Sequence, residues 1–440
     1  MNQHRSNNRF PSWVRWAVAL AVIIFVIGLG WSTLYRAGPH RFGDREWGSK
    51  AHRTDFTVYQ LAGRAVLEGT DLYEVRNQRG WAYVYPPPFA ILMAPLAKLS
   101  VFSGALLWYS LSVALLAWTV VMCARMVRQA AGAKVDTFWL ITVPLLLLLV
   151  WILSGLTRGQ ASVLMCWLVL AAVYWERDGR DLRAGACLAG AVILKAFPVV
   201  MLAYFVWRRK WRFVLATLVA LLVGLLVFPA AVFGWQKNLT YLREWTQKVA
   251  LASETVESER TSTDLNEQLL SWQKLRNQSL TAALWRITGS DLAKPLAIVI
   301  GLGMAAAMWY VGREAQPGEE LFVLSAFLVW TLLIPPISET HYFVMLILPL
   351  AVLTSVAVSG RGAAEGRLAT AVLVLFGVAA VASEFWQPLK AIGFLCWISL
   401  AVWAALLVLV ARRARAARGG QPDIGPTIAS AGSGKIAAGI

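Results

Sequence analysis

Hydrophobic residues in this 440-residue chain are gathered into long blocks, which short polar and mostly basic stretches separate. Many blocks approach the roughly 20 apolar residues that an α-helix needs to cross a bilayer, since each residue adds about 1.5 Å. The pattern predicts an all-α, polytopic transmembrane bundle with about ten full spans plus re-entrant or short helices. The expected spans are residues 13–35, 104–125, 137–155, 160–175, 211–233, 292–311, 320–336, 340–358, 367–385 and 391–411.

Two apolar stretches do not fit this series of full spans. Residues 88–99 are too short to cross a bilayer. Residues 184–207 are long enough to cross once, yet basic clusters flank both ends and Pro198 interrupts the middle. Irregular backbone at membrane depth is tolerated where it lines a protein cavity. We therefore expect 184–207 to form a re-entrant hairpin, with Lys195 at its buried turn.

The loops between the predicted spans fall into two classes by charge. The short loops rich in Arg and Lys share one side with the basic N-terminus, whereas the loops holding Asp55, Arg158, Asn277 and His341 share the other. The positive-inside rule places the basic side in the cytoplasm. The expected organisation is a cytoplasmic leader at 1–12, one membrane-embedded domain at 13–411 with helix-containing extracytoplasmic loops at 36–87 and 234–291, and a tail at 412–440 that is cytoplasmic, basic at first and then disordered.

Composition narrows the classes of protein further. With 58% hydrophobic residues and 22 Trp, the chain is too apolar for a soluble domain. The net charge of +17 comes from basic residues that mostly flank apolar blocks, which favours membrane lipids over nucleic acid as partners. The four cysteines fall inside apolar runs without metal-ligand spacing, so we expect neither a disulfide framework nor a zinc site.

Candidate chemistry begins in residues 54–89, directly after the first span. Thr54 and Gly69 are suited to begin and end a short amphipathic helix. Asp55 would then lie in the first turn, where a carboxylate interacts favourably with the helix dipole, and Tyr59 would share its face. Tyr85 and the prolines after it form a stiff connector. The sequence thus predicts an acidic residue held rigidly at the mouth of the bundle.

An ordered set of short motifs carries a family resemblance. The motifs are D-F-x-x-Y, A-G-R-A, G-x-D-L-Y, Y-x-Y-P-P-x-F, R-G-Q, L-K-A-F-P, R-N-Q-S-L and S-E-T-H-Y-F, and they extend roughly from Asp55 to Pro349. In this order they resemble glycosyltransferase family 87, which comprises polytopic GT-C-type membrane enzymes that use polyprenyl-phosphate sugars.

The resemblance implies an inverting glycosyltransferase in a bacterial plasma membrane, with both termini cytoplasmic and the active site facing the periplasm or exterior. A sugar, most commonly mannose, would move from a polyprenyl-phosphate carrier to a hydroxyl of a lipid or glycan acceptor. Asp55 occupies the position of the family's base. Because the paired acidic motif of metal-dependent GT-C relatives is missing, we expect no metal and no cofactor beyond the lipid-linked sugar.

The chemistry of the transfer also requires a base and cations. A base must remove the proton of the acceptor hydroxyl, whereas phosphate leaves as an anion and needs cations nearby. Asp55 is the candidate catalytic residue. The candidate substrate-binding residues are Tyr59, Arg64, Tyr85, Arg158, Gln160, Lys195, Arg276, Asn277, Gln278, Glu339 and His341.

Several alternatives stay open at this point. Asp55 could be a helix-start residue paired with Arg53 or Arg64, Lys195 could extend to an interface, and Asn277 also begins a glycosylation tripeptide. An arabinofuranosyl or other pentosyl transferase would use the same kind of carrier. A lipid-sugar transporter would also contain broken helices and charges at depth, but it would place its polar groups near the middle of the membrane.

Overall fold

The computed structural model describes residues 12–37, 54–77, 80–131, 135–247, 274–316, 318–359 and 363–419. Predictions for the leader, for 38–53, for 248–273 and for the tail beyond 419 lie outside these ranges. The helical elements are α1 (Ser12–Ala37), α2 (Phe56–Glu68), α3 (Pro87–Ala97), α4 (Val101–Ala131), α5 (Thr137–Leu147), α6 (Leu149–Arg158), α7 (Ser162–Arg177), α8 (Asp181–Leu194), η2 (Phe197–Val200), α9 (Met201–Trp207), α10 (Trp211–Leu222), η3 (Val223–Val227), α11 (Phe228–Phe233), α12 (Trp235–Trp245), α14 (Leu280–Thr288), α15 (Ala293–Gly312), α16 (Glu320–Leu333), η5 (Thr340–Leu346), α17 (Ile347–Ser359), α18 (Ala363–Phe385), α19 (Gln387–Ala391) and α20 (Phe394–Gly419).

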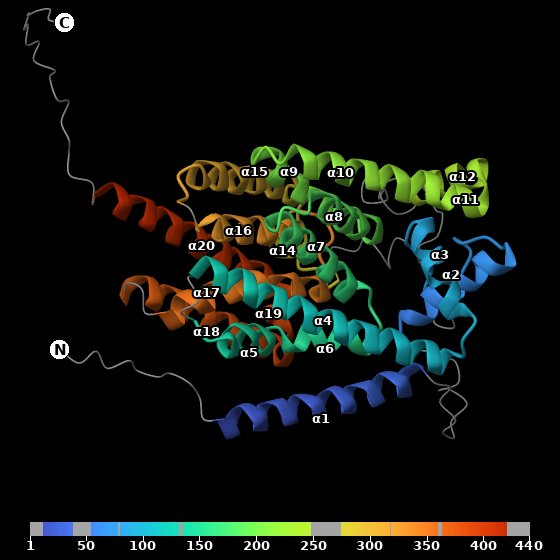
Figure 1. Ribbon diagram of the computed structural model, residues 1–440, viewed down its shortest axis with the longest axis horizontal. Coiled ribbons are helices and arrows are strands. Elements are labelled where there is room, and N and C mark those ends of the chain that lie inside the picture. The colour runs from blue at the N-terminus through green and yellow to red at the C-terminus, as the bar shows by residue number, and fades with distance from the viewer. Residues whose placement is uncertain are drawn as a thin grey trace, which may run out of the picture.

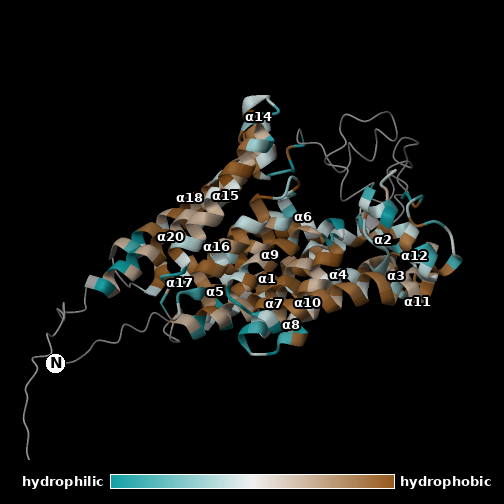
Figure 2. Ribbon diagram, turned by 90° about the horizontal axis from the view of Figure 1, so that it is seen from above, coloured by the Kyte–Doolittle hydropathy of each residue, from teal (hydrophilic) through white to brown (hydrophobic). Residues whose placement is uncertain are grey.

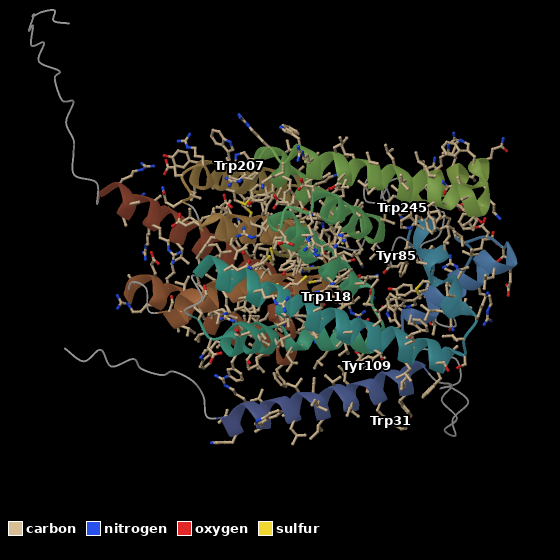
Figure 3. The ribbon with its side chains drawn as sticks, viewed as in Figure 1. Trp31, Tyr85, Tyr109, Trp118, Trp207 and Trp245 are labelled. Carbon is tan, nitrogen blue, oxygen red and sulfur yellow. The ribbon has the colours of Figure 1, made fainter. Side chains whose placement is uncertain are left out.

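These helices form an elongated bundle, with α2, α3, α11 and α12 grouped at one end (Figure 1). Within the described ranges the only β-type pairings are two isolated bridges, so the predicted all-α class is confirmed. Brown, hydrophobic ribbon dominates the middle of the bundle in Figure 2, and teal gathers at loops and helix ends. The apolar outer surface is large. Trp31 on α1, for example, points away from the bundle in Figure 3 and is 71% exposed, as expected for a helix that faces lipid.

Seven helical segments in the described part of the chain are long and apolar enough to cross a bilayer, and the bent pair α5 and α6 makes up to eight. The predicted spans at 160–175 and 320–336 also form helices, but α7 has 16 residues and α16 has 14. Both are shorter than the roughly 20 residues of a full span. The count of full spans is therefore lower than the ten expected, although the membrane bundle itself is as predicted.

The predicted span at 137–155 is bent in the structure. Its two halves, α5 and α6, meet at Leu148 with a bend of 68°. Pro144 lies inside α5 and cannot donate a backbone hydrogen bond, which weakens the helix one turn before the bend. Because the residues before and after the bend are equally apolar, the hydrophobic pattern of the sequence does not reveal it. The bend directs the end of α6 toward the start of α2.

The re-entrant hairpin at 184–207 is present. Helix α8 ends at Leu194, and Lys195 adopts extended backbone angles (φ −150°, ψ 121°) before η2 and α9 continue. The Nζ of Lys210, just after α9, lies 2.6 Å from Glu176 near the end of α7. The chain thus returns to the side of the bundle from which α8 departed, with Lys195 at the tip.

Charged helix ends gather on the side of the bundle opposite Asp55, which we call the basic face. Five ion pairs join helix ends there: Arg15 with Asp136, Lys210 with Glu176, Arg208 with Glu320, Arg413 with Glu365 and Arg418 with Glu314. On the other side, loops that were predicted to share that side are in contact. The Asp55 amide donates to the Arg158 carbonyl at 2.6 Å, and the Gln278 amide donates to the Ser338 carbonyl at 2.7 Å. The predicted segregation of loops therefore holds in three dimensions.

Candidate active site

The turn between α6 and α7 positions Asp55 with all three residues of the R-G-Q motif. The carbonyl of Arg158 accepts the Asp55 backbone amide, and the side-chain amide of Gln160 donates to the Asp55 carboxylate. Gly159 has a φ of 65°, and a Cβ there would lie 2.8 Å from the Cβ of Phe56. Only glycine fits both this left-handed turn and this close approach. All three residues of R-G-Q therefore contact Asp55 or its neighbour Phe56.

Asp55 occupies the N-cap position of α2, but its side chain makes no capping hydrogen bond. Thr54, which the sequence suggested as the cap, does not fill this role either, because its hydroxyl has no hydrogen-bond partner in the described part of the chain. Burial, together with the nearby Glu339 carboxylate, raises the pKa of Asp55 to about 7, against the opposing influence of Arg158, Lys195 and the Gln160 hydrogen bond. A carboxyl with a pKa near neutrality is suited to accept a proton.

Two tyrosine hydroxyls extend the contacts of Gln160. The hydroxyl of Tyr59 on α2 lies 2.9 Å from that of Tyr85 and donates toward the Gln160 side-chain oxygen at 3.5 Å. The two rings meet edge to face with centroids 5.2 Å apart, and Phe89 packs against both. Figure 3 shows Tyr85 where the α2 and α3 end joins the bundle. This packing holds Gln160, and through it the carboxylate of Asp55, in one orientation.

Lys195 supplies a cation on the opposite wall. Its Nζ donates to the hydroxyl of Tyr342 at 2.8 Å, and it lies 4.1 Å from the centroid of that ring and 5.6 Å from the centroid of Tyr85. The ring of Phe197 stacks on Tyr342 with centroids 5.2 Å apart and an interplanar angle of 14°. Both the lysine and the phenylalanine of the L-K-A-F-P motif therefore contact Tyr342.

The S-E-T-H-Y-F motif contributes a carboxylate and an imidazole. Glu339 Oε2 lies 3.3 Å from Nδ1 of His341. His341 is 2% exposed, and its Nε2 has no hydrogen-bond partner in the described part of the chain. Asn277 supports this segment, because its side chain donates to the Pro336 carbonyl at 2.9 Å and accepts from the Ser338 amide at 2.9 Å.

These groups surround a cavity of ≈ 90 Å³. Seven of the residues predicted from sequence line it, namely Asp55, Tyr59, Tyr85, Gln160, Lys195, Glu339 and His341. Sequence reasoning missed Tyr342, Trp81 and Val58, which line it as well. Tyr342 could have been found, since it directly follows His341 inside a motif.

Five further candidates lie outside the cavity lining. Arg64 is on the exposed face of α2, and Arg276 is also exposed. Arg158 is half-buried and acts on Asp55 through its backbone carbonyl and its charge. The side chains of Asn277 and Gln278 bind backbone carbonyls, with Gln278 donating to Leu275 at 2.7 Å and Lys390 at 3.1 Å. The Asn277 side chain thereby supports the loop that carries Glu339, whereas the Gln278 side chain joins its own loop to α19.

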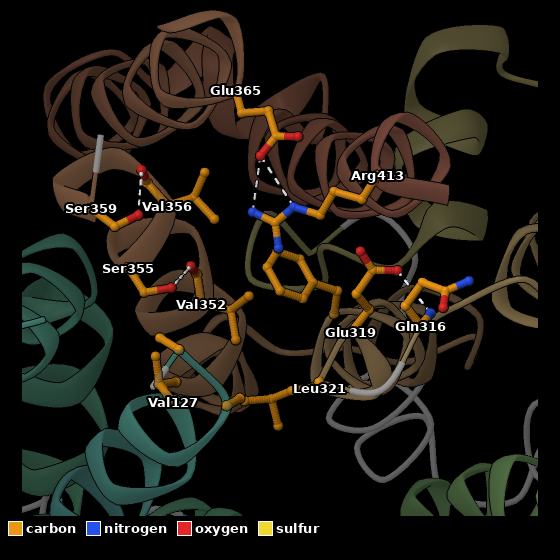
Figure 4. A pocket seen from close by; sticks show the side chains of 14 residues that line it. Val127, Gln316, Glu319, Leu321, Val352, Ser355, Val356, Ser359, Glu365 and Arg413 are labelled. Carbon is orange, nitrogen blue, oxygen red and sulfur yellow. Dashed lines mark hydrogen bonds and ion pairs between the residues drawn. The ribbon is translucent and has the colours of Figure 1, made fainter. Parts of the chain in front are cut away.

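A larger cavity of ≈ 390 Å³ opens at the basic face, lined by the starts of α16 and α18 and the ends of α4, α17 and α20 (Figure 4). Its charged side chains already form hydrogen bonds with protein groups. Arg413 donates to Glu365 through Nε at 3.1 Å and Nη2 at 2.9 Å, and Glu319 accepts the Gln316 amide at 3.0 Å. No residue of the sequence motifs lines this cavity. The smaller cavity at Asp55 is therefore the candidate active site.

Comparison with known proteins assigns the family. The model of glycosyltransferase family 87 matches residues 83–336, more than half of the chain. The chain belongs to glycosyltransferase family 87. This family 87 protein is thus a glycosyltransferase, as the motifs predicted. The matched region includes Tyr85, Gln160 and Lys195, whereas Asp55 and His341 lie on either side of it.

Two curated relatives are similar along most of the family 87 chain. A polyprenol-phosphate-mannose-dependent alpha-(1-2)-phosphatidylinositol mannoside mannosyltransferase of Mycobacterium tuberculosis is 25% identical over 397 residues, which cover 84% of this chain and 88% of the relative. A protein of the same name from Mycolicibacterium smegmatis is 27% identical over 345 residues, 73% of each chain. Among solved structures, ArnT from Cupriavidus metallidurans bound to undecaprenyl phosphate aligns with a TM-score of 0.38 and 14% identity, over 91% of this chain and 78% of ArnT.

Proposed function

We propose that this family 87 enzyme transfers a mannosyl group from a polyprenol-phosphate carrier to a hydroxyl of a lipid or glycan acceptor, with inversion at the anomeric carbon. The donor is supported by the names of both curated relatives. The observation that carries the proposal is the cavity itself, which places one buried carboxylate, Asp55, opposite one cation, Lys195. A base and a phosphate-binding cation are the two groups that this reaction requires.

In the proposed reaction, the acceptor oxygen attacks the anomeric carbon and Asp55 takes the hydroxyl proton. The bond from that carbon to the phosphate oxygen breaks, and the electron pair leaves with polyprenyl phosphate. Lys195 Nζ and the Tyr342 hydroxyl, 2.8 Å apart, stabilise the charge that develops on the phosphate. Attack and departure on opposite faces of the sugar carbon produce inversion.

The cavity volume indicates which part of the substrates it holds. At ≈ 90 Å³ it is several times smaller than the roughly 300–1,000 Å³ of a pocket that encloses a whole drug-sized ligand. Only the reacting hydroxyl, the anomeric centre and adjacent phosphate oxygens would fit without movement of the walls. The carrier chain and the remainder of the acceptor therefore extend out of the cavity in this proposal.

We further propose that Asp55 faces the outside of a bacterial plasma membrane and that the termini are cytoplasmic. The ion-paired, arginine-rich helix ends lie on the face opposite Asp55. Such ends are retained in the cytoplasm during insertion. This orientation matches a lipid-linked donor that is used outside the cell.

The test uses membranes containing the full chain, the Asp55→Asn form, or the Glu68→Gln form as a matched control. Glu68 ends the same helix but is exposed. Each membrane is given radiolabelled polyprenyl-phosphate mannose or a polyprenyl-phosphate pentose, with and without EDTA. We expect mannose transfer by the wild type and by Glu68→Gln, at least about a hundredfold loss in Asp55→Asn, and no effect of EDTA.

Each other outcome removes a specific part of the proposal. Equal transfer by Asp55→Asn would show that this carboxylate is not the base. Transfer of pentose in place of mannose would support the pentosyl alternative. Loss of activity with EDTA would mean that a metal ion, and not Lys195 alone, balances the phosphate charge.

A further inference from the structure

A groove separate from the active site runs between the start of α8 and α10 on the basic face. Its volume is ≈ 830 Å³, and three arginines, Arg180, Arg183 and Arg212, lie in its lining. Figure 2 shows teal, hydrophilic ribbon beside α8 on the opposite side of the molecule from α14. None of the residues that line the Asp55 cavity lines this groove.

Two of the arginines are available to a ligand. Arg180 lies 2.8 Å from Asp178 and is partly neutralised by it. Arg183 and Arg212 are exposed, and the structure shows no ion pair for either within the described residues. Asp181 is the single acidic residue among the described residues in the lining. The polar end of the groove therefore carries a net positive charge, which favours an anion.

The rest of the groove is apolar and lies along a helix that can cross the membrane. Leu215, Val219 and Val223 are spaced four residues apart on one helix face, and they are 63%, 50% and 48% exposed. From the first to the third is about 12 Å of helix. They belong to the candidate span Trp211–Phe233, so the face that they expose meets hydrocarbon chains.

The wall of the groove has a defined shape because α8 and α10 pack very closely. A Cβ added to Gly185 on α8 would lie 2.7 Å from the Ala216 Cβ and 2.7 Å from the Thr217 amide nitrogen. Trp211, exposed by 58% at the first residue of α10, is suited to the level of the lipid head groups. Along α10, Trp211 and Arg212 lie at the first turn and the apolar row follows, so the polar end and the apolar part of the groove are ordered as head groups and chains are in a bilayer.

We propose that this groove binds an anionic glycerophospholipid of the leaflet at the basic face. Its phosphate lies between Arg183 and Arg212, and an acyl chain lies along Leu215, Val219 and Val223. The groove opens on the face opposite Asp55, so its lipid is distinct from the lipid-linked sugar donor. The bound lipid joins the start of α8 to α10 and thereby stabilises the hairpin that α8 begins.

The experiment measures lipid binding to the purified full chain by native mass spectrometry and by thermal unfolding. Phosphatidylglycerol, phosphatidylcholine and glycerol phosphate are the probes. The test variant is Arg183→Gln with Arg212→Gln. The control is Arg412→Gln with Arg415→Gln, which removes the same charge from exposed positions on α20 at the same face. The variant Arg183→Lys with Arg212→Lys tests whether positive charge alone is sufficient for binding.

We expect the wild type to bind phosphatidylglycerol and to gain thermal stability from it, with weaker binding of phosphatidylcholine. Loss of both groove arginines should weaken phosphatidylglycerol binding roughly thirtyfold, since each basic residue near an anionic lipid contributes about fivefold. The control should change it less than about twofold. Arg183→Lys with Arg212→Lys should retain most of the affinity, because the positive charge near the phosphate is kept.

Three results would overturn the assignment. Equal losses in the groove and control variants would mean that lipid follows the overall charge of this face. Unchanged binding after loss of Arg183 and Arg212 would place the lipid elsewhere. Glycerol phosphate binding as tightly as phosphatidylglycerol would show an anion site that makes no use of the apolar row.

Discussion

The hydrogen bond from Gln160 to Asp55 leads to a quantitative prediction for the Gln160→Leu variant. The change keeps side-chain volume nearly constant but removes the donor to the Asp55 carboxylate and the acceptor for the Tyr59 hydroxyl. The hydrogen bond stabilises the ionised form of Asp55, so its loss raises the pKa of that carboxyl further. A base that is more often protonated is less often able to take the acceptor's proton.

The magnitude follows from the burial of this pair. Both Asp55 and Gln160 are 8% exposed, and a hydrogen bond to a buried charged group contributes about 1.5–3 kcal/mol. That corresponds to a pKa shift of about one to two units. The pKa of Asp55 would rise from about 7 to about 8–9. At pH 7 the ionised fraction then falls from about a half to about 1–10%, so kcat/KM drops by about 5–50-fold.

The assay is the pH dependence of kcat/KM for transfer from the polyprenyl-phosphate sugar, followed from pH 5.5 to 9 in detergent-solubilised enzyme. Activity that depends on ionised Asp55 increases as the pH rises through the pKa and is lost below it. The donor is a phosphodiester and does not titrate in this range. We expect the midpoint of the acid limb near pH 7 in the wild type and at clearly higher pH in Gln160→Leu.

The matched control is Gln60→Leu. Gln60 is another buried glutamine, whose Nε2 donates to the carbonyls of Leu96 and Leu99 at 3.1 Å and 3.0 Å, away from the cavity. This control should lower thermal stability without moving the acid limb. If Gln160→Leu reduces kcat/KM by the same factor at every pH, the reasoning is refuted, and Gln160 acts by positioning substrate instead of tuning the base.

Two further predictions follow from the electrostatics and the orientation. Glu339→Gln removes a negative charge that raises the pKa of Asp55, so the acid limb should move to lower pH, opposite to Gln160→Leu. An unmoved limb would show that the Glu339 side chain does not influence the pKa of Asp55. Because all four native cysteines are buried, single cysteines at Gln236→Cys on α12 and Arg415→Cys on α20 can report orientation. A membrane-impermeant maleimide should label only the first in intact cells, and labelling of the second alone would reverse the proposed topology.

The sequence predicted residues that line the candidate active site where their local requirements are strong. A lysine in the middle of an apolar run must find a polar environment, and Lys195 does lie at the tip of a hairpin that lines the cavity. Asp55 after the first span and Gln160 after a short turn reach the same cavity. Several motifs were informative because they contact one another: R-G-Q contacts Asp55, and L-K-A-F-P contacts Tyr342.

The candidates that lie outside the cavity lining, and the lining residue that was overlooked, show the limits of local information. Arg64 is on the helix that carries Asp55, but its rotation about the helix axis leaves it exposed. Asn277 faces the loop of Ser338 and not the cavity, because its side chain satisfies backbone groups there. Tyr342 directly follows His341 inside a motif, but its contacts with Lys195 and Phe197, far away in sequence, could not be read from that position.

By itself, the sequence determined that the chain lies in a membrane, where most helices form, that basic residues gather on one face, and which residues are candidates for the chemistry. These properties have two physical causes: exposing unpaired backbone polar groups to lipid is costly, and basic loops are retained on the cytoplasmic side. Each cause acts over short stretches of chain. Only the tertiary structure decided the bend between α5 and α6, the meeting of Asp55 with Gln160, and the pKa of the carboxyl. Those properties arise from burial and from contacts between segments about a hundred residues apart, which no local pattern encodes.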